Sequence, residues 1–346
     1  MQAVVVHGAG DLRVEDVPDP TCPPDAVLVR MEWGGVCGSD LSYWKNGASG
    51  TAILRDPLVL GHEVAGRVAE IGAAVDPAAL GDIEVGTPVT VHPATLVGDE
   101  GLPEDLADRT NLWPQVRYFG SAAFQPHEAG GFSELRAVRP DQLRRLPDGV
   151  STREAALAEP LGVAIHALHR AGDITGRSLL VNGCGPIGLL AVAAARAMGA
   201  RHITAADLSP AALDLATALG ADAVVDISAG DALPADVEIA VEASGAPRAL
   251  GGVIAAVRRG GVLVQVGNLP AGEVSAALGN IVTREIDYRG SYRFVDEISE
   301  ALTMLAGPVD FTPVITHTFD LAQAQEAFEV AADRSTGSSK VLLRLS

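Results

Sequence analysis

The sequence predicts an α/β protein with two domains, and three observations support this. The chain has 346 residues, which is more than one hydrophobic core usually holds. Residues 1–152 are rich in short valine-containing segments broken by glycine and proline, as is typical of an irregular all-β unit. In residues 153–290, apolar strands alternate with helical segments, and this alternation builds a doubly wound parallel sheet.

The elements after residue 152 can be placed in order. A helical pattern over 153–170 precedes five short apolar segments, each suited to a buried strand. The expected strands are 179–181, 203–206, 223–225, 237–241 and 262–266. The last part of the chain, 291–346, is expected to hold a helix at 295–306, a helix near 322–332 and a closing strand at 340–345.

A glycine-rich turn follows the first of these strands. Gly183-Cys184-Gly185-Pro186-Ile187-Gly188 leads into an alanine-rich helical stretch, 189–198. Such glycines permit a tight turn, close approach of the backbone to a pyrophosphate and close helix packing, while the helix N-terminus favours an anion. The second strand ends at Asp207, whose carboxylate can accept hydrogen bonds from ribose hydroxyls and would repel a 2′-phosphate. The pattern predicts a dinucleotide site that prefers NAD to NADP; a glycine turn without a ligand is the alternative.

Side chains with donor atoms that zinc prefers occur in three separate segments. Cys37 lies in 35–40, His62 and Glu63 lie in 61–66, and Glu159 lies in 158–163. A thiolate, an imidazole and a carboxylate can hold zinc with three protein ligands and leave a fourth position open, as in catalytic sites. Because a lone cysteine or histidine is usually a packing residue, the prediction rests on the whole set together with the nucleotide signature.

Composition argues against several classes of function. A formal net charge of −19 argues against a nucleic-acid or anionic-membrane partner. No apolar run is long and clean enough to span a bilayer, and the N-terminal residues are typical of a strand rather than a signal peptide, so we expect a cytoplasmic protein. The three cysteines, Cys22, Cys37 and Cys184, do not suggest a disulfide framework.

These residues resemble the zinc-dependent medium-chain alcohol and polyol dehydrogenase family, and most closely its L-idonate 5-dehydrogenase branch. Further similar segments are 118–122, 241–245, 280–286 and 289–294, so the resemblance covers essentially the whole chain. It implies a chaperonin-10-like catalytic domain built from both chain ends, an inserted Rossmann domain and an active site in the cleft. It also implies an enzyme that uses zinc and NAD and forms a homodimer or homotetramer.

The resemblance assigns roles to individual residues. The implied metal ligands are Cys37, His62, Glu63 and Glu159, of which Glu159 would bind zinc directly or through water. Asp40 would fix the tautomer of His62, or else be a turn residue. The implied catalytic residues are Ser39, which takes the substrate proton, Tyr43, Glu159 and Arg293. The implied cofactor-binding residues are Gly183, Gly185, Pro186, Ile187, Gly188, Asp207, Val266, Gly267, Asn268, Ser291, Tyr292 and Arg293.

Two departures from the family pattern affect these expectations. Many relatives carry a histidine where this chain has Ser42, so water or the cofactor ribose would complete the proton relay. Many relatives also carry four closely spaced cysteines for a structural zinc, whereas residues 93–114 contain none. We therefore expect one catalytic zinc per chain and no structural zinc.

The expected reaction is NAD-dependent oxidation of a secondary hydroxyl of a sugar acid or polyol to a ketone. L-Idonate, oxidised to 5-keto-gluconate, is the first candidate, because Arg293 could clamp a carboxylate; solvation of Arg293 at the surface is the alternative. Sorbitol, another polyol or threonine could be the substrate of the same scaffold. A nucleotide-binding relative without catalysis is a further alternative.

Overall fold

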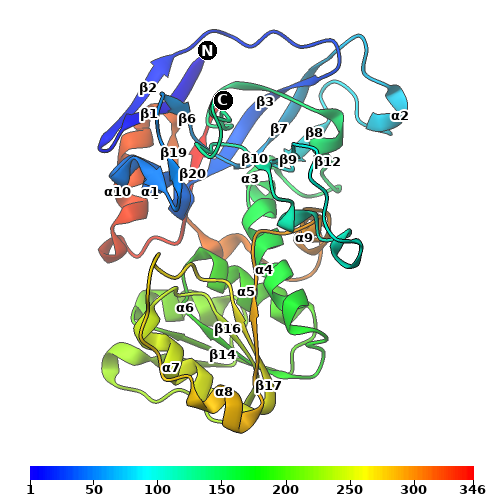
Figure 1. The fold of residues 1–346 in the computed structure, drawn as a ribbon. Helices are drawn as coiled ribbons and strands as arrows, with labels where there is room; N and C mark the ends of the chain where they lie inside the picture. The colour runs from blue at the N-terminus through cyan, green and yellow to red at the C-terminus, as the bar shows by residue number, and fades with distance from the viewer. The chain divides into compact units, whose positions relative to one another are not determined.

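Two structural units make up the chain in the computed structural model, which describes all 346 residues (Figure 1). Unit 1 joins Met1–Glu159 to Ile315–Ser346, and unit 2 is Pro160–Val314. The boundaries differ from those expected at 152 and 290. Residues 291–314 belong to unit 2, because Phe294 and Ile298 pack closely against Gly162, near the start of that unit.

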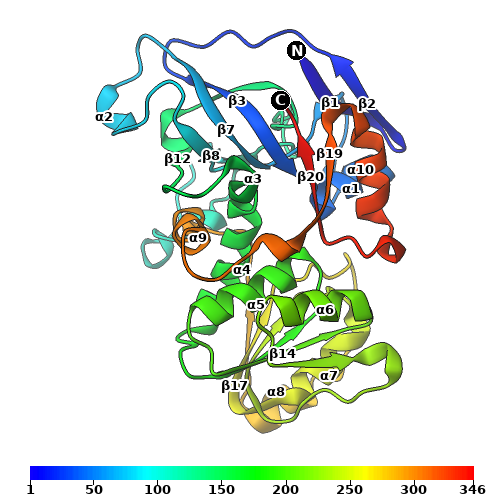
Figure 2. The same ribbon diagram turned by 180° about the vertical axis from the view of Figure 1, so that it is seen from behind.

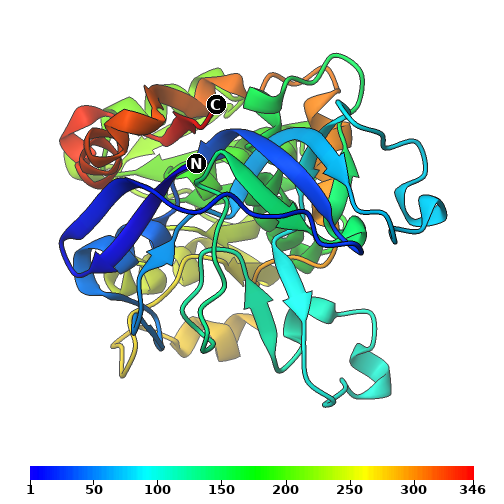
Figure 3. The same ribbon diagram turned by 90° about the horizontal axis from the view of Figure 1, so that it is seen from above.

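Unit 1 is built on a seven-stranded sheet in the order β12-β8-β7-β3-β20-β19, with β11 also pairing with β3. The strands of this sheet are β3 (Val27–Gly35), β7 (Glu63–Ile71), β8 (Pro88–Val91), β11 (Leu135–Val138), β12 (Leu143–Arg145), β19 (Ile315–Asp320) and β20 (Lys340–Arg344). The last strand of the chain, β20, runs antiparallel to β3, so the C-terminal segment completes the N-terminal sheet. Both termini lie beside this sheet (Figure 3).

Smaller elements surround that sheet. The other strands of unit 1 are β1 (Gln2–Gly8), β2 (Asp11–Asp16), β4 (Ala48–Ser49), β5 (Ala52–Ile53), β6 (Leu58–Val59), β9 (Ala94–Leu96) and β10 (Val116–Tyr118). Its helices are α1 (Gly38–Asn46), α2 (Pro77–Leu80), α3 (Thr152–Ala155) and α10 (Ala324–Ala332), and its 3₁₀ turns are η1 (Glu104–Leu106), η2 (Thr110–Leu112), η3 (Pro140–Gln142), η6 (Leu321–Gln323) and η7 (Arg334–Thr336). The core between them is made of valine and leucine with Phe132 and Phe328, whose rings meet edge to face.

Helix α1 was not expected in a unit that showed little helical periodicity. Its ends nevertheless carry ordinary signals. Asp40, in the first turn, accepts a hydrogen bond from the backbone N–H of Cys37, and Gly47 ends the helix in the left-handed conformation with φ +65°. The helix is short and its apolar residues are few, so its periodicity is weak in the sequence.

Unit 2 contains the predicted doubly wound parallel sheet, in the order β15-β14-β13-β16-β17-β18. The strands are β13 (Ser178–Asn182), β14 (His202–Asp207), β15 (Ala223–Asp226), β16 (Val237–Glu242), β17 (Val257–Gln265) and β18 (Asp287–Gly290). The helices are α4 (Ala158–Ala171), whose first two residues belong to unit 1, then α5 (Pro186–Ala197), α6 (Pro210–Ala218), α7 (Pro247–Ala256), α8 (Gly279–Arg284) and α9 (Glu297–Leu305); η4 (Ile227–Ala229) and η5 (Thr312–Val314) are 3₁₀ turns.

Helices cover both faces of this sheet: α5 and α6 lie on one side, and α7 and α8 on the other (Figure 2). The strand order reverses between β13 and β16, and ligands of such sheets bind at the carboxyl ends of the strands at that point. All five strands expected from the sequence are present, and β18 is an additional edge strand. None of the helices has both the length and the apolar character that crossing a membrane requires.

Candidate metal centre and nucleotide-binding site

Three neighbouring strands of unit 1 bring the metal-centre residues to one end of the sheet. Strand β3 leads into Cys37, β7 begins at Glu63, and β20 begins at Lys340. Because β3 is antiparallel to both β7 and β20, the end of β3 lies beside the start of each. Gly35 leaves room for this arrangement, since a Cβ atom there would lie 2.2 Å from Oε2 of Glu63.

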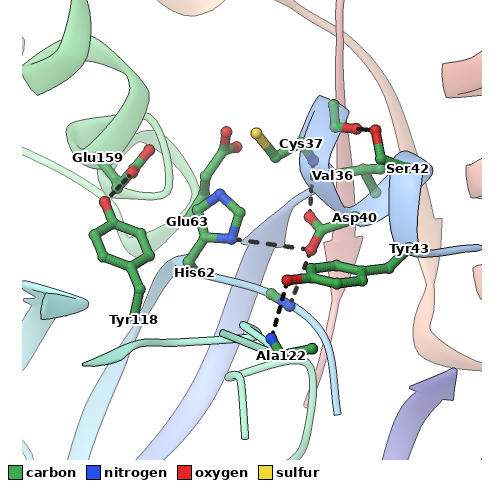
Figure 4. A network of polar contacts seen from close by, with 12 residues as sticks. Val36, Cys37, Asp40, Ser42, Tyr43, His62, Glu63, Tyr118, Ala122 and Glu159 are labelled. Atoms are coloured by element: carbon green, nitrogen blue, oxygen red, sulfur yellow. Dashed lines mark hydrogen bonds and ion pairs between the residues drawn. The ribbon is translucent and has the colours of Figure 1, made fainter. Parts of the chain in front are cut away.

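The side chains of Cys37, His62 and Glu63 form the candidate metal centre (Figure 4). One ligand atom from each lies within 4.8 Å of the other two, and the histidine and glutamate are 6% and 1% exposed. A soft thiolate, an imidazole and a carboxylate on such spacing suit zinc. The residues present therefore fit the metal that the sequence predicted.

Buried charges surround this cluster. Lys340, 2% exposed, contacts both carboxylate oxygens of Glu63 at 2.6 and 2.7 Å and donates to the carbonyl of Val36. Burial lowers the pKa of Lys340, but the acidic groups around it, Glu63 above all, together raise the pKa above its ordinary value. Burial would likewise lower the pKa of His62, yet the acidic groups of Cys37 and Asp40 raise it well above its ordinary value. A centre that favours positive charge on its histidine is one that suits a cation.

Glu159 lies apart from the three-ligand cluster. It stands in the first turn of α4, and its Oε1 accepts a hydrogen bond of 2.6 Å from the hydroxyl of Tyr118 (Figure 4). Burial raises the pKa of Glu159, while the nearby His62 lowers it. The ring of Tyr118 also meets the His62 imidazole edge to face at 5.7 Å, so one tyrosine contacts two predicted site residues.

Asp40 mainly organises the backbone of the centre. Its fully buried carboxylate accepts hydrogen bonds from the N–H groups of Cys37 at 2.9 Å and Gly61 at 3.3 Å. The Nδ1 atom of His62 lies 3.9 Å from Oδ1 of Asp40, which is an ion-pair distance and too long for a hydrogen bond. Burial raises the pKa of Asp40. Asp40 thus joins the start of α1 to the segment that carries His62.

The other predicted catalytic residues of unit 1 lie on α1. Ser39 is half-buried in its first turn. Ser42 donates back to the carbonyl of Gly38 at 2.9 Å, so its hydroxyl is occupied within the helix. Tyr43 is 3% exposed, and its hydroxyl oxygen accepts from the N–H of Ala122, which leaves its own proton available for donation (Figure 4).

In unit 2, the glycine-rich turn has the geometry that a phosphate cradle requires. Gly183 has φ +96°, a conformation that favours glycine. A Cβ atom at Gly188 would lie 1.8 Å from the carbonyl oxygen of Gly183, so this residue permits the helix to pack on the turn. Gly185, the residue that caps α5, has open space where its Cβ would be. Pro186 and Ile187 form the first helical turn, whose N–H groups can bind an anion.

Asp207 is hydrogen-bonded to this turn. Its Oδ2 accepts from the N–H of Cys184 at 2.6 Å, and its Oδ1 accepts from the N–H groups of Leu208 and Ser209. The carboxylate is therefore fixed at the carboxyl end of β14, beside the glycine-rich turn. A fixed anion there suits the ribose hydroxyls of NAD.

The remaining predicted cofactor residues follow β17 and β18, on the other side of the switch point. Val266 and Gly267 donate to the carbonyl of Glu242, and a Cβ atom at Gly267 would lie 2.3 Å from the nitrogen of Gly245. Asn268 also lies against Gly245, since a Cβ atom on Gly245 would lie 2.3 Å from the carbonyl oxygen of Asn268. The N–H of Ser291 donates to the carbonyl of Gln265 at 2.9 Å, whereas its buried hydroxyl has no partner within the chain. Such an orphaned hydroxyl at this edge fits a bound dinucleotide.

Tyr292 and Arg293 continue this segment. Arg293 has φ +51°, and its guanidinium lies 5.0 Å from the centre of the Tyr292 ring. A positive φ is rare for arginine and is found where surrounding structure fixes the backbone.

Sequence reasoning missed two residues of the metal centre. Lys340 was placed only at the start of a strand, although it is one of two lysines in a chain whose other basic side chains are arginine. That rarity is the single signal that could have drawn attention to it. Tyr118 was recognised as part of a family-like segment, but its contact with Glu159 spans 41 residues and has no local pattern.

Known proteins resemble this chain over its whole length. Residues 23–148 match the alcohol dehydrogenase GroES-like domain, and residues 186–307 match the zinc-binding dehydrogenase domain. Sorbitol dehydrogenase of Gallus gallus is 38% identical, and the match covers 94% of this chain and 92% of that protein.

Two solved structures add to this comparison. L-Idonate 5-dehydrogenase from Escherichia coli matches with a TM-score of 0.88 and 32% identity, covering 99% of this chain and 97% of that chain. A zinc-binding dehydrogenase from Sinorhizobium meliloti, bound to NADP, matches with a TM-score of 0.87 and 30% identity, covering 99% and 98%.

Proposed function

The chain belongs to the zinc-dependent medium-chain polyol dehydrogenase family, and we propose on this premise that it oxidises a secondary hydroxyl of a sugar acid, with L-idonate as first candidate. The enzyme is an oxidoreductase that uses zinc and NAD. The observation that carries the zinc-dependent oxidation is the cluster of half-buried Cys37 with buried His62 and Glu63, whose ligand atoms lie within 4.8 Å of one another.

We assign the metal to these three residues. When bound, zinc lowers the pKa of an alcohol hydroxyl and so makes its proton easier to remove. Both oxygens of Glu63 contact Lys340, and a carboxylate has enough lone pairs to serve a metal and an ammonium group together. Glu159, held by Tyr118, would bind through water or directly during turnover.

The chain's own residues would handle the proton and the hydride acceptor. Ser39, in the first turn of α1, would take the hydroxyl proton and pass it on to water or to the cofactor ribose. NAD, when bound, would accept a hydride from the carbon that bears this hydroxyl, so the products would be a ketone, NADH and one proton. Ser42 is turned back onto its own helix, which is why we do not include it in the relay.

The choice of an acid over a neutral polyol is supported by two observations. The Escherichia coli protein with a TM-score of 0.88 is named L-idonate 5-dehydrogenase. Arg293 provides a guanidinium that can bind a carboxylate in a bidentate manner. The sorbitol dehydrogenases among the relatives favour the second candidate, a neutral polyol such as sorbitol.

A substrate panel tests the proposal. NADH formation would be followed with L-idonate, sorbitol, xylitol and L-threonine, and we expect the highest kcat/KM for L-idonate. Arg293→Ala should reduce that preference as well as the rate, because an acid substrate would lose its cation. Equal or better turnover of the neutral polyols by the wild-type enzyme would contradict the acid assignment.

A pair of cysteine variants tests the metal assignment. Cys37→Ala should remove both zinc and activity, whereas Cys22→Ala, a half-buried thiol outside the cluster, should affect neither. Retention of zinc by Cys37→Ala would show that the metal lies elsewhere.

For location and assembly, we propose a cytoplasmic homodimer or homotetramer. Both the location and the assembly are proposed from likeness to the family. The net charge of −19 supports the location, because a large net charge favours solubility. Light scattering of the purified protein would measure the mass of the assembly.

A further inference from the structure

One face of α4 holds both ends of the segment that follows β18. The face is made of Gly162, His166, His169 and Arg170, which recur at helical spacing and so point to one side of α4. The segment, residues 291–296, connects β18 to α9 and carries the predicted cofactor residues Ser291, Tyr292 and Arg293. All of these residues belong to unit 2.

At the start of the segment, Arg170 is the anchor. Its Nε donates to the carbonyl of Gly290 at 3.1 Å, and Arg289 donates in return to the carbonyl of Arg170 at 2.9 Å. These two bonds fix the last residues of β18 to the end of α4. The backbone of Ser291 is held at the same time by the carbonyl of Gln265.

At the end of the segment, Glu297 is the anchor. Its Oε1 lies 2.6 Å from Nδ1 of His166 and 3.5 Å from Nδ1 of His169, and its Oε2 accepts from the N–H of Val295 at 2.6 Å. One carboxylate therefore links α4 to the backbone of the segment. His169 also contacts Glu300 at 3.2 Å, one turn further along α9.

Gly162 allows the close approach that these bonds need. A Cβ atom there would lie 3.2 Å from the backbone nitrogen of Ile298 and 3.4 Å from the ring of Phe294. Any larger residue would push the start of α9 away from α4. The absence of a side chain at 162 thus complements the polar contacts of His166 and Arg170.

The held segment contains two features that need support. Arg293 has φ +51°, which costs free energy unless the surroundings fix it, and the Ser291 hydroxyl is buried without a partner. Both lie at the carboxyl end of β18, on the opposite side of the switch point from Asp207. Because a dinucleotide spans the switch point, the half that reaches β18 is the nicotinamide half when Asp207 binds the adenosine ribose.

We propose that this face of α4 is a positioning element that holds the segment 291–296 ready for the nicotinamide half of the cofactor. The proposal rests on the proposed function, since it takes residues 291–293 as cofactor contacts. His166, His169 and Arg170 act through the segment and touch neither cofactor nor substrate in this role. Preorganisation of this kind strengthens binding by reducing the cost of ordering the loop.

The test compares NADH with ADP-ribose, which lacks the nicotinamide ring. We expect His166→Leu to raise the Kd for NADH about tenfold, because one charge-assisted contact of Glu297 is lost. The Kd for ADP-ribose should stay within about twofold, since the adenosine half binds at Asp207. His166→Asn, which restores a donor near the position of Nδ1, should recover most of the NADH affinity.

Two further variants keep the test decisive. Arg170→Met removes the other anchor but keeps the apolar stem, and it should weaken NADH selectively even if His166→Leu folds poorly. His202→Leu, at the amino end of β14 beside Asp222, is the matched control and should leave both constants unchanged.

The inference would be overturned if folded His166→Leu and Arg170→Met bound NADH with an unchanged Kd. It would also be overturned if both variants bound NADH and ADP-ribose equally more weakly. Either result would leave the proposed function intact. Failure of the wild-type protein to bind either molecule would overturn the proposed function and the inference with it.

Discussion

At the scale of single residues, Lys340 is the buried counter-charge of Glu63 in the candidate metal centre. We expect Lys340→Met to leave the carboxylate buried without its counter-charge, and breaking such a pair costs about 3–5 kcal/mol. Because bound zinc would supply a replacement positive charge, the loss should be larger in the zinc-free protein than in the zinc-loaded protein. Calorimetric unfolding of both forms measures this difference.

The chain offers a matched control for that experiment. Lys45, the only other lysine, is exposed on α1, and Lys45→Met should change the free energy of unfolding by no more than about 0.5 kcal/mol. A loss in Lys340→Met that is equal with and without zinc would contradict the view that Lys340 and the metal share one carboxylate.

Asp207 gives a second prediction at this scale, on the choice between NAD and NADP. Asp207→Asn keeps the shape of the side chain but removes its charge, so we expect the Kd for NAD to rise about tenfold and NADP to be accepted more readily. The thermal stability should also fall, because both carboxylate oxygens accept from backbone N–H groups and the amide nitrogen of asparagine cannot accept in place of one of them. Fluorescence titration with both reduced cofactors would measure the change. The choice of cofactor needs this test because one of the similar solved structures is bound to NADP. Wild-type protein that bound NADP more tightly than NAD would refute the role given to Asp207.

At the scale of elements, the turn between β13 and α5 contains one glycine needed for packing, Gly188, and one expected to matter for cofactor binding, Gly185. Gly188→Ala would place a Cβ atom 1.8 Å from the carbonyl of Gly183, and such overpacking costs about 1–3 kcal/mol. Gly185→Ala meets nothing within the chain, so stability should change by about 1 kcal/mol or less. Its methyl group would nevertheless occupy the space that a pyrophosphate needs. We therefore expect Gly188→Ala to lower the melting temperature, and Gly185→Ala to weaken NAD binding in a protein that remains folded.

The contact between α4 and α9 predicts a dependence of stability on pH. Burial would raise the pKa of Glu297, but hydrogen bonds from His166 and His169 hold it well below its usual range. A depressed carboxyl pKa stabilises the fold above the unfolded value of about 4.3, and this contribution is lost as the pH falls. The hydrogen bond to Glu297 raises the pKa of His169 above 6.5, so its contribution is lost as the pH rises through that raised value.

The difference in melting temperature between wild type and Glu297→Gln should therefore be largest between about pH 4.3 and pH 6.5. It should shrink on both sides of that window. Glu273→Gln, at an exposed position in the same unit, is the control and should show no such window. A difference that stays constant with pH would mean that the charge of Glu297 is unimportant.

The elements also show how far the sequence could be read. The strands of unit 2 were predictable because each is a short apolar run followed by glycine or an acid, and the glycine-rich turn marks the first of them. Strand β18 was not predicted, since Asp287–Gly290 lies on the edge of the sheet and is largely polar. Helix α1 was missed for a similar reason, as its buried face consists of Asp40 and Tyr43 rather than a regular apolar stripe.

The residues of the candidate site also fall into those that local sequence segments predict and those that only the folded sheet brings together. Cys37, His62 and Glu63 could be proposed because each lies in a short recognisable segment, and the structure brings their ligand atoms together. Contacts such as Lys340 with Glu63 join residues 277 positions apart, and no local spacing encodes them. They arise from the antiparallel pairing of β20, β3 and β7, which is a property of the whole sheet.

At the scale of the whole molecule, the number of zinc ions follows from where the thiols lie. Of the three cysteines, Cys37 alone belongs to the metal-ligand cluster. Residues 93–114, where the family resemblance implies a place for a structural zinc, contain no cysteine. In the structure it is held by pairing of β9 with β10 and by a hydrogen bond of 2.9 Å from Nε1 of Trp113 to the carbonyl of Val97.

We therefore expect one zinc ion per chain in zinc-replete protein, measured by elemental analysis against protein concentration. A chelator should remove zinc and activity together, while far-ultraviolet circular dichroism should change little, because the bonds that hold residues 93–114 come from the backbone and an indole. Two tightly held ions per chain would contradict this prediction. Partial unfolding on removal of a single ion would show instead that the catalytic metal also holds unit 1 together, through the ends of β3, β7 and β20.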